Sequence, residues 1–118
     1  MQRGMLLDVD SAAVVVRRVM RTTTPWDRLR GLLGQPPLAD DAGLLLSPCN
    51  GIHTLFMAYA IDVVFLDRTY LVTRVVTGLP PWRASFAPRA AMTLELAAGV
   101  AARLALAPGR RLRWQPQL

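Results

Sequence analysis

Two runs rich in β-branched residues, 61–66 and 71–76, constrain the fold of this chain more than any other feature of its sequence. Only residues 67–70 separate them, and a connection of that length fits an antiparallel hairpin. The connections between the other apolar runs are also too short for the repeated helical crossovers that parallel strands require. The sequence therefore disfavours a doubly wound fold and predicts an antiparallel or mixed sheet.

Further strands are predicted on both sides of this hairpin. Residues 12–20 are rich in valine, which favours a strand, but Arg17 and Arg18 interrupt the run, so we expect this strand near a sheet edge. Short apolar or alternating patterns predict three more strands, at residues 43–46, 89–96 and 110–114. The proline-rich residues 78–88 are expected to form an irregular surface segment.

Two short helices complete the prediction. Thr24 followed by Pro25 is typical of a helix start, because threonine can cap free N–H groups and proline fits the first turn. This helix would end near Gly34 and carry one apolar stripe, formed by Trp26, Leu29, Leu32 and Leu33. A second helix is expected at residues 99–106. We therefore predict one α+β domain over residues 1–118, with a strongly curved, barrel-like antiparallel or mixed sheet.

Composition limits the classes of protein to which the chain can belong. With 118 residues and 53% hydrophobic content, it can bury a core without disulfides or a structural metal. No apolar run reaches the ~20 residues that a membrane-spanning helix needs. Asp8 and Asp10 interrupt what would be the apolar centre of a secretory signal, so we expect a cytoplasmic location. A lone cysteine agrees with a reducing compartment.

The net charge of +6 is unevenly distributed. Residues 61–118 carry eight arginines against three acidic residues, whereas residues 1–60 are nearly balanced. A basic C-terminal half could face nucleic acid, anionic lipid or an acidic protein. However, every basic residue is arginine, which indicates a compositional bias, and no combined aromatic and basic binding motif accompanies the charge. We favour an ordinary solvated surface.

The segment 49–67 contains the only cysteine and the only histidine. Cys49 and His53 could form a thiolate and imidazole pair, with Asp62 or Asp67 orienting the ring. The alternative is a buried Cys49 that behaves as a small apolar residue beside a hydrogen-bonded His53. Cys49, His53 and Asp62 are too few for a structural zinc site, although Met57 would suit copper. We expect no metal or cofactor.

The carboxylates have ordinary structural interpretations as well. Asp62 would either cap the start of its strand or pair with an arginine. Asp67 would accept a hydrogen bond from the backbone of its own hairpin turn. Glu95 alternates with Leu94 and Leu96, so we expect it to point outward and pair with an arginine. Arg30, which precedes Gly31, could contact an anion or form an ion pair.

An ordered set of motifs resembles the domain of unknown function 192 family, in particular its branch with cysteine and histidine. The resemblance covers residues 26–114 and rests on RGLLG at 30–34, on Cys49, Ile52, His53, Thr54 and Met57, on IDVVFLD at 61–67, and on LEL at 94–96 with Gly99 and Gly109. It implies a small α+β domain with a barrel-like sheet and no established reaction. Many members of the family look exported or membrane-anchored.

Three functional hypotheses follow. The first is a non-enzymatic accessory or interaction domain that binds a peptide, a protein or a small ligand in a groove beside residues 49–57. The second is a small thiol-dependent enzyme or redox sensor that uses Cys49 with His53. The third is a basic module that contacts nucleic acid or anionic lipid. We favour the first, with a binding site formed by Arg30, Cys49, His53, Thr54, Met57 and Asp62.

Overall fold

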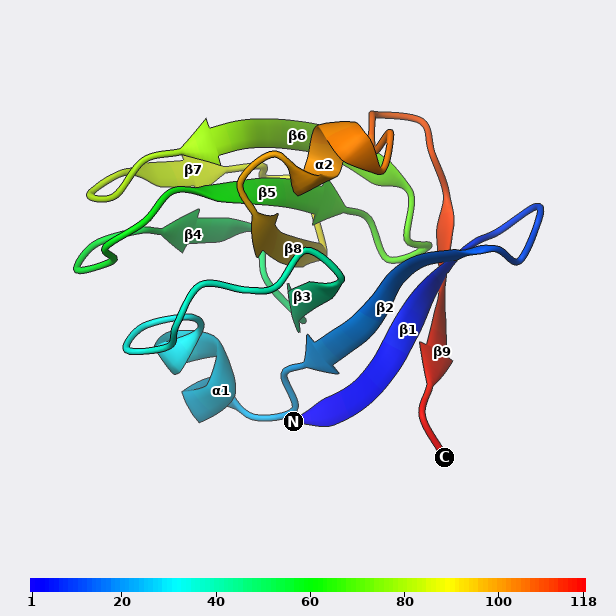
Figure 1. The fold of residues 1–118 in the computed structure, drawn as a ribbon, viewed down its shortest axis with the longest axis horizontal. Helices are drawn as coiled ribbons and strands as arrows, with labels where there is room; N and C mark the ends of the chain where they lie inside the picture. The colour runs from blue at the N-terminus through cyan, green and yellow to red at the C-terminus, as the bar shows by residue number, and fades with distance from the viewer.

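A seven-stranded mixed sheet and a separate two-stranded ribbon form most of the molecule, and two short helices accompany them (Figure 1). The computed structural model describes residues 1–118. The elements are, in order, β1 (Gln2–Asp8), β2 (Val14–Arg21), α1 (Pro25–Arg30), β3 (Ala42–Leu46), β4 (Gly51–His53), β5 (Ile61–Leu66), β6 (Val72–Leu79), β7 (Ala84–Phe86), β8 (Met92–Ala97), α2 (Val100–Arg103) and β9 (Leu112–Pro116). The protein is thus mostly β, in one compact domain with two short helices.

The large sheet has the strand order β6-β5-β8-β3-β2-β1-β9. All neighbouring strands are antiparallel except β2 and β3, whose parallel connection contains α1. The predicted hairpin is confirmed, because β5 pairs with β6 in antiparallel register. The edge strands β6 and β9 do not pair along their length; one isolated bridge, between Leu71 and Arg111, lies just before the two strands. The predicted barrel-like closure is therefore not confirmed.

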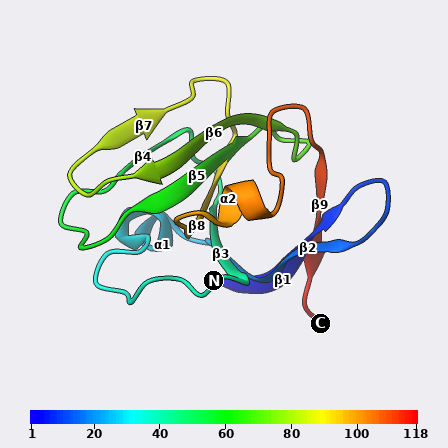
Figure 2. The same cartoon turned by 45° about the horizontal axis from the view of Figure 1, so that its top comes forward.

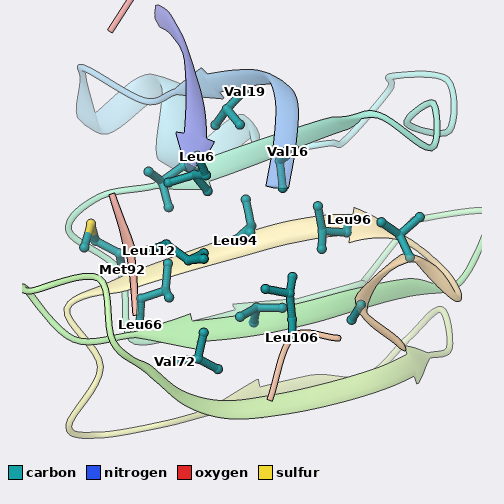
Figure 3. Close-up of a cluster of buried hydrophobic side chains, with 14 residues drawn as sticks. Leu6, Val16, Val19, Leu66, Val72, Met92, Leu94, Leu96, Leu106 and Leu112 are labelled. Carbon is teal, nitrogen blue, oxygen red and sulfur yellow. The ribbon is translucent and has the colours of Figure 1, made fainter. Parts of the chain in front are cut away.

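Both faces of the central strands β3, β5 and β8 are covered. One face packs in a core that includes residues of β1, β2, β9 and α2, which we call the α2-side core; in Figure 3 these side chains converge from several strands, as shown by Leu6, Val16, Leu66, Leu94, Leu96 and Leu112. The opposite face forms the α1-side core with residues that follow α1 and with the β4–β7 ribbon. In Figure 2, α2 lies across the sheet from the β4–β7 ribbon.

Strand alternation decides which side chains enter which core. On β5, Val63 enters the α1-side core and Val64 enters the α2-side core, and every residue of this strand is buried. On β8, Leu94 and Leu96 belong to the α2-side core. Because side chains alternate along a strand, Glu95 of β8 faces the α1-side core.

Three predictions about the strands differ from the structure. Strand β1 was not predicted, because its apolar run is short and interrupted by polar residues and Gly4. With β1 and β9 outside it, β2 is the third strand from one edge of the sheet and lies further inside than expected. Arg18 is accommodated there because it lies on an exposed face and forms an ion pair with Asp41. The ribbon β4–β7 was not predicted either: β7 lies within residues 78–88, which were expected to be irregular, and it pairs with β4, as Ser85 does with Ile52.

The first helix is shorter than predicted. Thr24 caps it as expected, since its hydroxyl accepts a hydrogen bond from the Asp27 N–H at 3.1 Å. The helix ends at Arg30, followed by Gly31 with a φ of 50°. Trp26 and Leu29 are 68% and 70% exposed, so the predicted apolar stripe does not pack as a unit, and Leu32 of that stripe is the residue that enters the core. Neither helix has the length or the apolar sequence needed to cross a bilayer.

Candidate functional site

A pocket of about 200 Å³ lies between α1, the turn that follows it, and residues 49–57. We call it the α1 pocket. Its apolar wall consists of Leu29, Leu32, Leu33, Leu46, Ile52 and Leu55. Its polar or polarisable lining consists of Arg28, Arg30, Cys49, His53, Met57 and Glu95. Residues far apart in the sequence therefore meet in one concave site, which is the usual form of a small-ligand site.

Four of the six residues predicted for the site line this pocket. Arg30 reaches it from the last turn of α1, where its side chain is exposed. Cys49 is half-buried and lies in the loop before β4, and His53 is the last residue of β4. Met57 is half-buried in the loop that follows. The short ribbon formed by β4 and β7 holds this segment against the α1-side core.

Glu95 is the residue that sequence reasoning placed incorrectly. It is only 5% exposed, and its Oε2 atom has no hydrogen-bond partner. On β8 it lies opposite Leu44 of β3 and Val63 of β5, which both belong to the α1-side core. Burial raises the pKa of Glu95 from 4.5 to about 7. The expectation that Glu95 points outward and pairs with an arginine is therefore wrong.

The error has an identifiable cause. Alternation places Glu95 on the face opposite Leu94 and Leu96, but that face is solvent-exposed only if nothing covers it. Here the residues after α1 and the ribbon cover it. A signal was available in the neighbouring strand, because the run at 61–66 has apolar residues at both odd and even positions, which is typical of a strand buried on both faces.

Tyr59 ties a neighbouring loop to this region. Its hydroxyl donates a hydrogen bond to the carbonyl oxygen of Gln35 at 3.1 Å. Burial raises the pKa of Tyr59, and the negative charge of Glu95 raises it further. The carboxyl of Glu95 is thus close enough to influence Tyr59, although no hydrogen bond joins them.

Cys49 and His53 have separate partners. The thiol of Cys49 donates to the carbonyl oxygen of Gly51 at 3.1 Å. Nδ1 of His53 accepts a hydrogen bond from the Leu55 N–H at 3.3 Å, and the ring is exposed. The two side chains line the same pocket but are not hydrogen-bonded to each other. The arrangement does not by itself provide the imidazole contact by which a histidine activates a thiol.

Thr54 and Asp62 are both completely buried and lie outside the pocket lining. The Thr54 hydroxyl donates to the carbonyl oxygen of Pro80 at 2.6 Å and accepts from the Arg83 N–H at 2.9 Å. It joins the segment 49–57 to the loop before β7. The two carboxylate oxygens of Asp62 accept hydrogen bonds from the N–H groups of Gly78 and Ala101, at 2.8 and 2.9 Å.

Asp62 therefore connects β5 to β6 and to α2, and it does not orient His53. No three side chains among histidine, cysteine, aspartate and glutamate lie close enough to hold a metal ion together. Asp67 bonds within its own turn, as expected, because its Oδ1 accepts from the Thr69 N–H at 2.8 Å. The carboxylate of the α1 pocket is Glu95 alone.

Several arginines have internal partners. Arg110 forms an ion pair with Asp8, and Arg21 lies over the ring of Trp114, with its guanidinium carbon 5.5 Å from the ring centre. Arg21 also donates a hydrogen bond to Tyr70. These contacts use arginine to hold β2 and β9 in place, so part of the positive charge has a structural role.

Solved structures with the same fold exist. One is a protein of unknown function from Novosphingobium aromaticivorans, with 21% identity and a TM-score of 0.75 over 95% of this chain and 84% of the other. Another is a candidate transcription regulator from Sinorhizobium meliloti, with 22% identity and a TM-score of 0.80 over 96% of this chain and 92% of the other. No curated protein matches the sequence.

A family model supports the resemblance inferred from the motifs. The model is described as DUF192, Uncharacterized ACR, and it matches residues 5–114. The match begins within β1, so it includes part of β1 and all of β2. Its description names no activity. The chain belongs to the DUF192 family of uncharacterised proteins.

Proposed function

We propose that this protein is a non-enzymatic binding domain whose α1 pocket takes a small ligand or one side chain of a peptide. The observation that carries the proposal is the position of Glu95, a carboxyl group that is buried in the lining of the pocket without a hydrogen-bond partner for Oε2. A buried polar atom without a partner lowers stability. A ligand with a donor group near Oε2 would form the missing hydrogen bond and would be bound more tightly for that reason.

The rest of the pocket supports a binding role. Its wall is apolar, and two arginines and a histidine lie beside it. Sites for small molecules commonly combine an apolar wall with a few polar groups that fix the orientation of the ligand. Thr54 is buried and fully hydrogen-bonded, and it anchors the segment 49–57 that forms one wall of the pocket.

The two other hypotheses have less support. A thiol-dependent enzyme would require activation of Cys49, but its thiol donates to the Gly51 carbonyl, and His53 is bonded elsewhere. For a nucleic-acid or lipid module, Arg18, Arg21 and Arg110 would be less available, because they have partners within the protein. Binding in the α1 pocket is the function that the geometry favours.

The proposal can be tested by NMR on the ¹⁵N-labelled protein. A panel of small aliphatic amines, carboxylic acids, amides and tripeptides should include compounds that shift the amide signals of α1 and residues 49–57. Leu33→Trp should prevent those shifts, because Leu33 lines the pocket. Val14→Trp is the matched control, since both residues are 42% exposed and Val14 lies on β2 outside the pocket. Shifts that are absent, or that persist in Leu33→Trp, would contradict the proposal.

A further inference from the structure

We propose that the α1 pocket recognises a zwitterion with a short aliphatic spacer, whose cation pairs with Glu95 and whose carboxylate binds Arg28 and Arg30. This is the chemistry of a free basic amino acid, and also of a lysine or arginine at the C-terminus of a peptide. The inference rests on the proposed function and specifies the ligand that the pocket selects.

The cation is assigned from the buried end of the pocket. Glu95 takes part in none of the three ion pairs of the structure, and its Oε2 has no hydrogen-bond partner. An ionised carboxylate buried in this way is compensated most strongly by a cation that also donates hydrogen bonds. An ammonium or guanidinium group has both properties. A neutral ligand would supply at most a hydrogen bond.

The spacer is assigned from the walls. Leu32, Leu46 and Ile52 are buried and apolar, and Met57 is half-buried beside them. The methylene stems of lysine and arginine pack well against such surfaces while their charged heads reach polar groups. A volume of about 200 Å³ suits one such side chain and not a large ligand.

The carboxylate is assigned from the charge at the mouth. Arg28 and Arg30 lie in the last turn of α1, with Arg28 half-buried and Arg30 exposed. Neither belongs to an ion pair. Two guanidinium groups at the mouth disfavour a simple amine, but they attract a ligand that also carries a carboxylate. A zwitterion therefore matches both ends of the pocket at once.

The experiment compares four ligands of similar length by calorimetry at pH 8: 6-aminohexanoate, hexylamine, hexanoate and hexanamide. The zwitterion should bind at least tenfold more tightly than each of the other three. Glu95→Gln should remove its advantage over hexanoate, and Arg28→Gln/Arg30→Gln should remove its advantage over hexylamine. Asp40→Asn and Arg68→Gln/Arg89→Gln are the charge-matched controls, because all three residues are exposed and lie outside the pocket. These controls should change neither ratio.

Two further ligands separate the sources of the zwitterion. Free lysine represents a small molecule, and acetyl-Gly-Gly-Lys with a free carboxylate represents a peptide terminus, with its C-terminal amide as the control. Binding of the peptide acid but not the amide identifies a C-terminal residue as the ligand. Binding of free lysine alone identifies a small molecule.

The outcomes also separate this inference from the proposed function. If hexanoate or hexanamide occupies the pocket as tightly as the zwitterion, the inference is wrong and the binding function stands. A zwitterion advantage that is unchanged in Glu95→Gln, with the variant's fold checked by circular dichroism, would also overturn the inference. If no ligand of this set binds, the inference fails, and an NMR panel that shows no shifts in the pocket rejects the binding function as well.

Discussion

Replacing Glu95 by glutamine should stabilise the protein at pH 8 and leave its stability nearly unchanged at pH 4. The reason is that burial raises the pKa of Glu95 to about 7, whereas the carboxyl group of the unfolded chain titrates near its ordinary value of 4.5. Between these two pH values the folded protein binds more protons than the unfolded chain. The free energy of unfolding of the wild type therefore decreases as the pH rises through this range.

The size of the effect follows from the same two pKa values. One pKa unit corresponds to about 1.4 kcal/mol, so a rise from 4.5 to about 7 corresponds to about 3 kcal/mol. This contribution is fully present below pH 4.5 and is lost as the pH passes 7. Glutamine has a similar shape and does not ionise, so Glu95→Gln should be about 3 kcal/mol more stable than the wild type at pH 8 and nearly equal to it at pH 4.

Urea denaturation between pH 4 and pH 8, followed by tryptophan fluorescence, measures this difference. Subtracting the wild-type free energy from that of the variant at each pH cancels the titration of the other groups. Asp40→Asn is the control, because Asp40 is exposed, and its difference should be flat across the range. A flat difference for Glu95→Gln would refute the reasoning, since it would mean that the carboxyl group is not held in an apolar environment.

The remaining predictions concern two buried polar side chains and the thiol. Thr54→Val should lower the free energy of unfolding by about 1–3 kcal/mol in urea denaturation, because it leaves the part-buried N–H of Arg83 and the carbonyl oxygen of Pro80 without their partner; a loss below about 0.5 kcal/mol would count against this role. Asp62→Ala should lower the free energy of unfolding by at least about 3 kcal/mol in the same assay, because the N–H groups of Gly78 and Ala101 lose their acceptor. An unchanged denaturation midpoint would contradict the role of Asp62 in connecting β5 to β6 and α2. His53→Ala should leave the rate of Cys49 alkylation unchanged, since no hydrogen bond joins the two side chains; a marked fall in that rate would revive the enzyme hypothesis. Ligand in the α1 pocket should slow this alkylation, and an equal rate with saturating 6-aminohexanoate would place that ligand elsewhere.

Much of the fold could be predicted because its signals are local. The hairpin of β5 and β6 depends on two adjacent runs and the short turn between them, and the start of α1 depends on Thr24 and its neighbours. The ribbon of β4 and β7 could not be predicted in this way. Each of its strands has only three residues, and β5 and β6 separate the two strands in the sequence.

The site was predictable to the extent that its residues lie close together in the sequence. Cys49, His53 and Met57 belong to one segment, and all three line the α1 pocket with Arg30. Asp62 follows closely in the sequence, but side chains alternate along β5, so Asp62 lies on the face opposite the pocket. There it accepts a hydrogen bond from the Ala101 N–H of α2. Glu95 reaches the pocket only because other elements cover its face of the sheet, which is a property of the tertiary structure.

The position of β9 at one edge of the sheet gives the C-terminal arginines a further consequence. An edge strand leaves backbone donors and acceptors free, and these can pair with a strand of another molecule and start aggregation. Arg111 and Arg113 are exposed at this edge on either side of the buried Leu112. Charged side chains on an edge strand oppose such pairing, because two like-charged edges repel each other. Arg111 and Arg113 thus act against edge-to-edge pairing of two copies of the chain at β9.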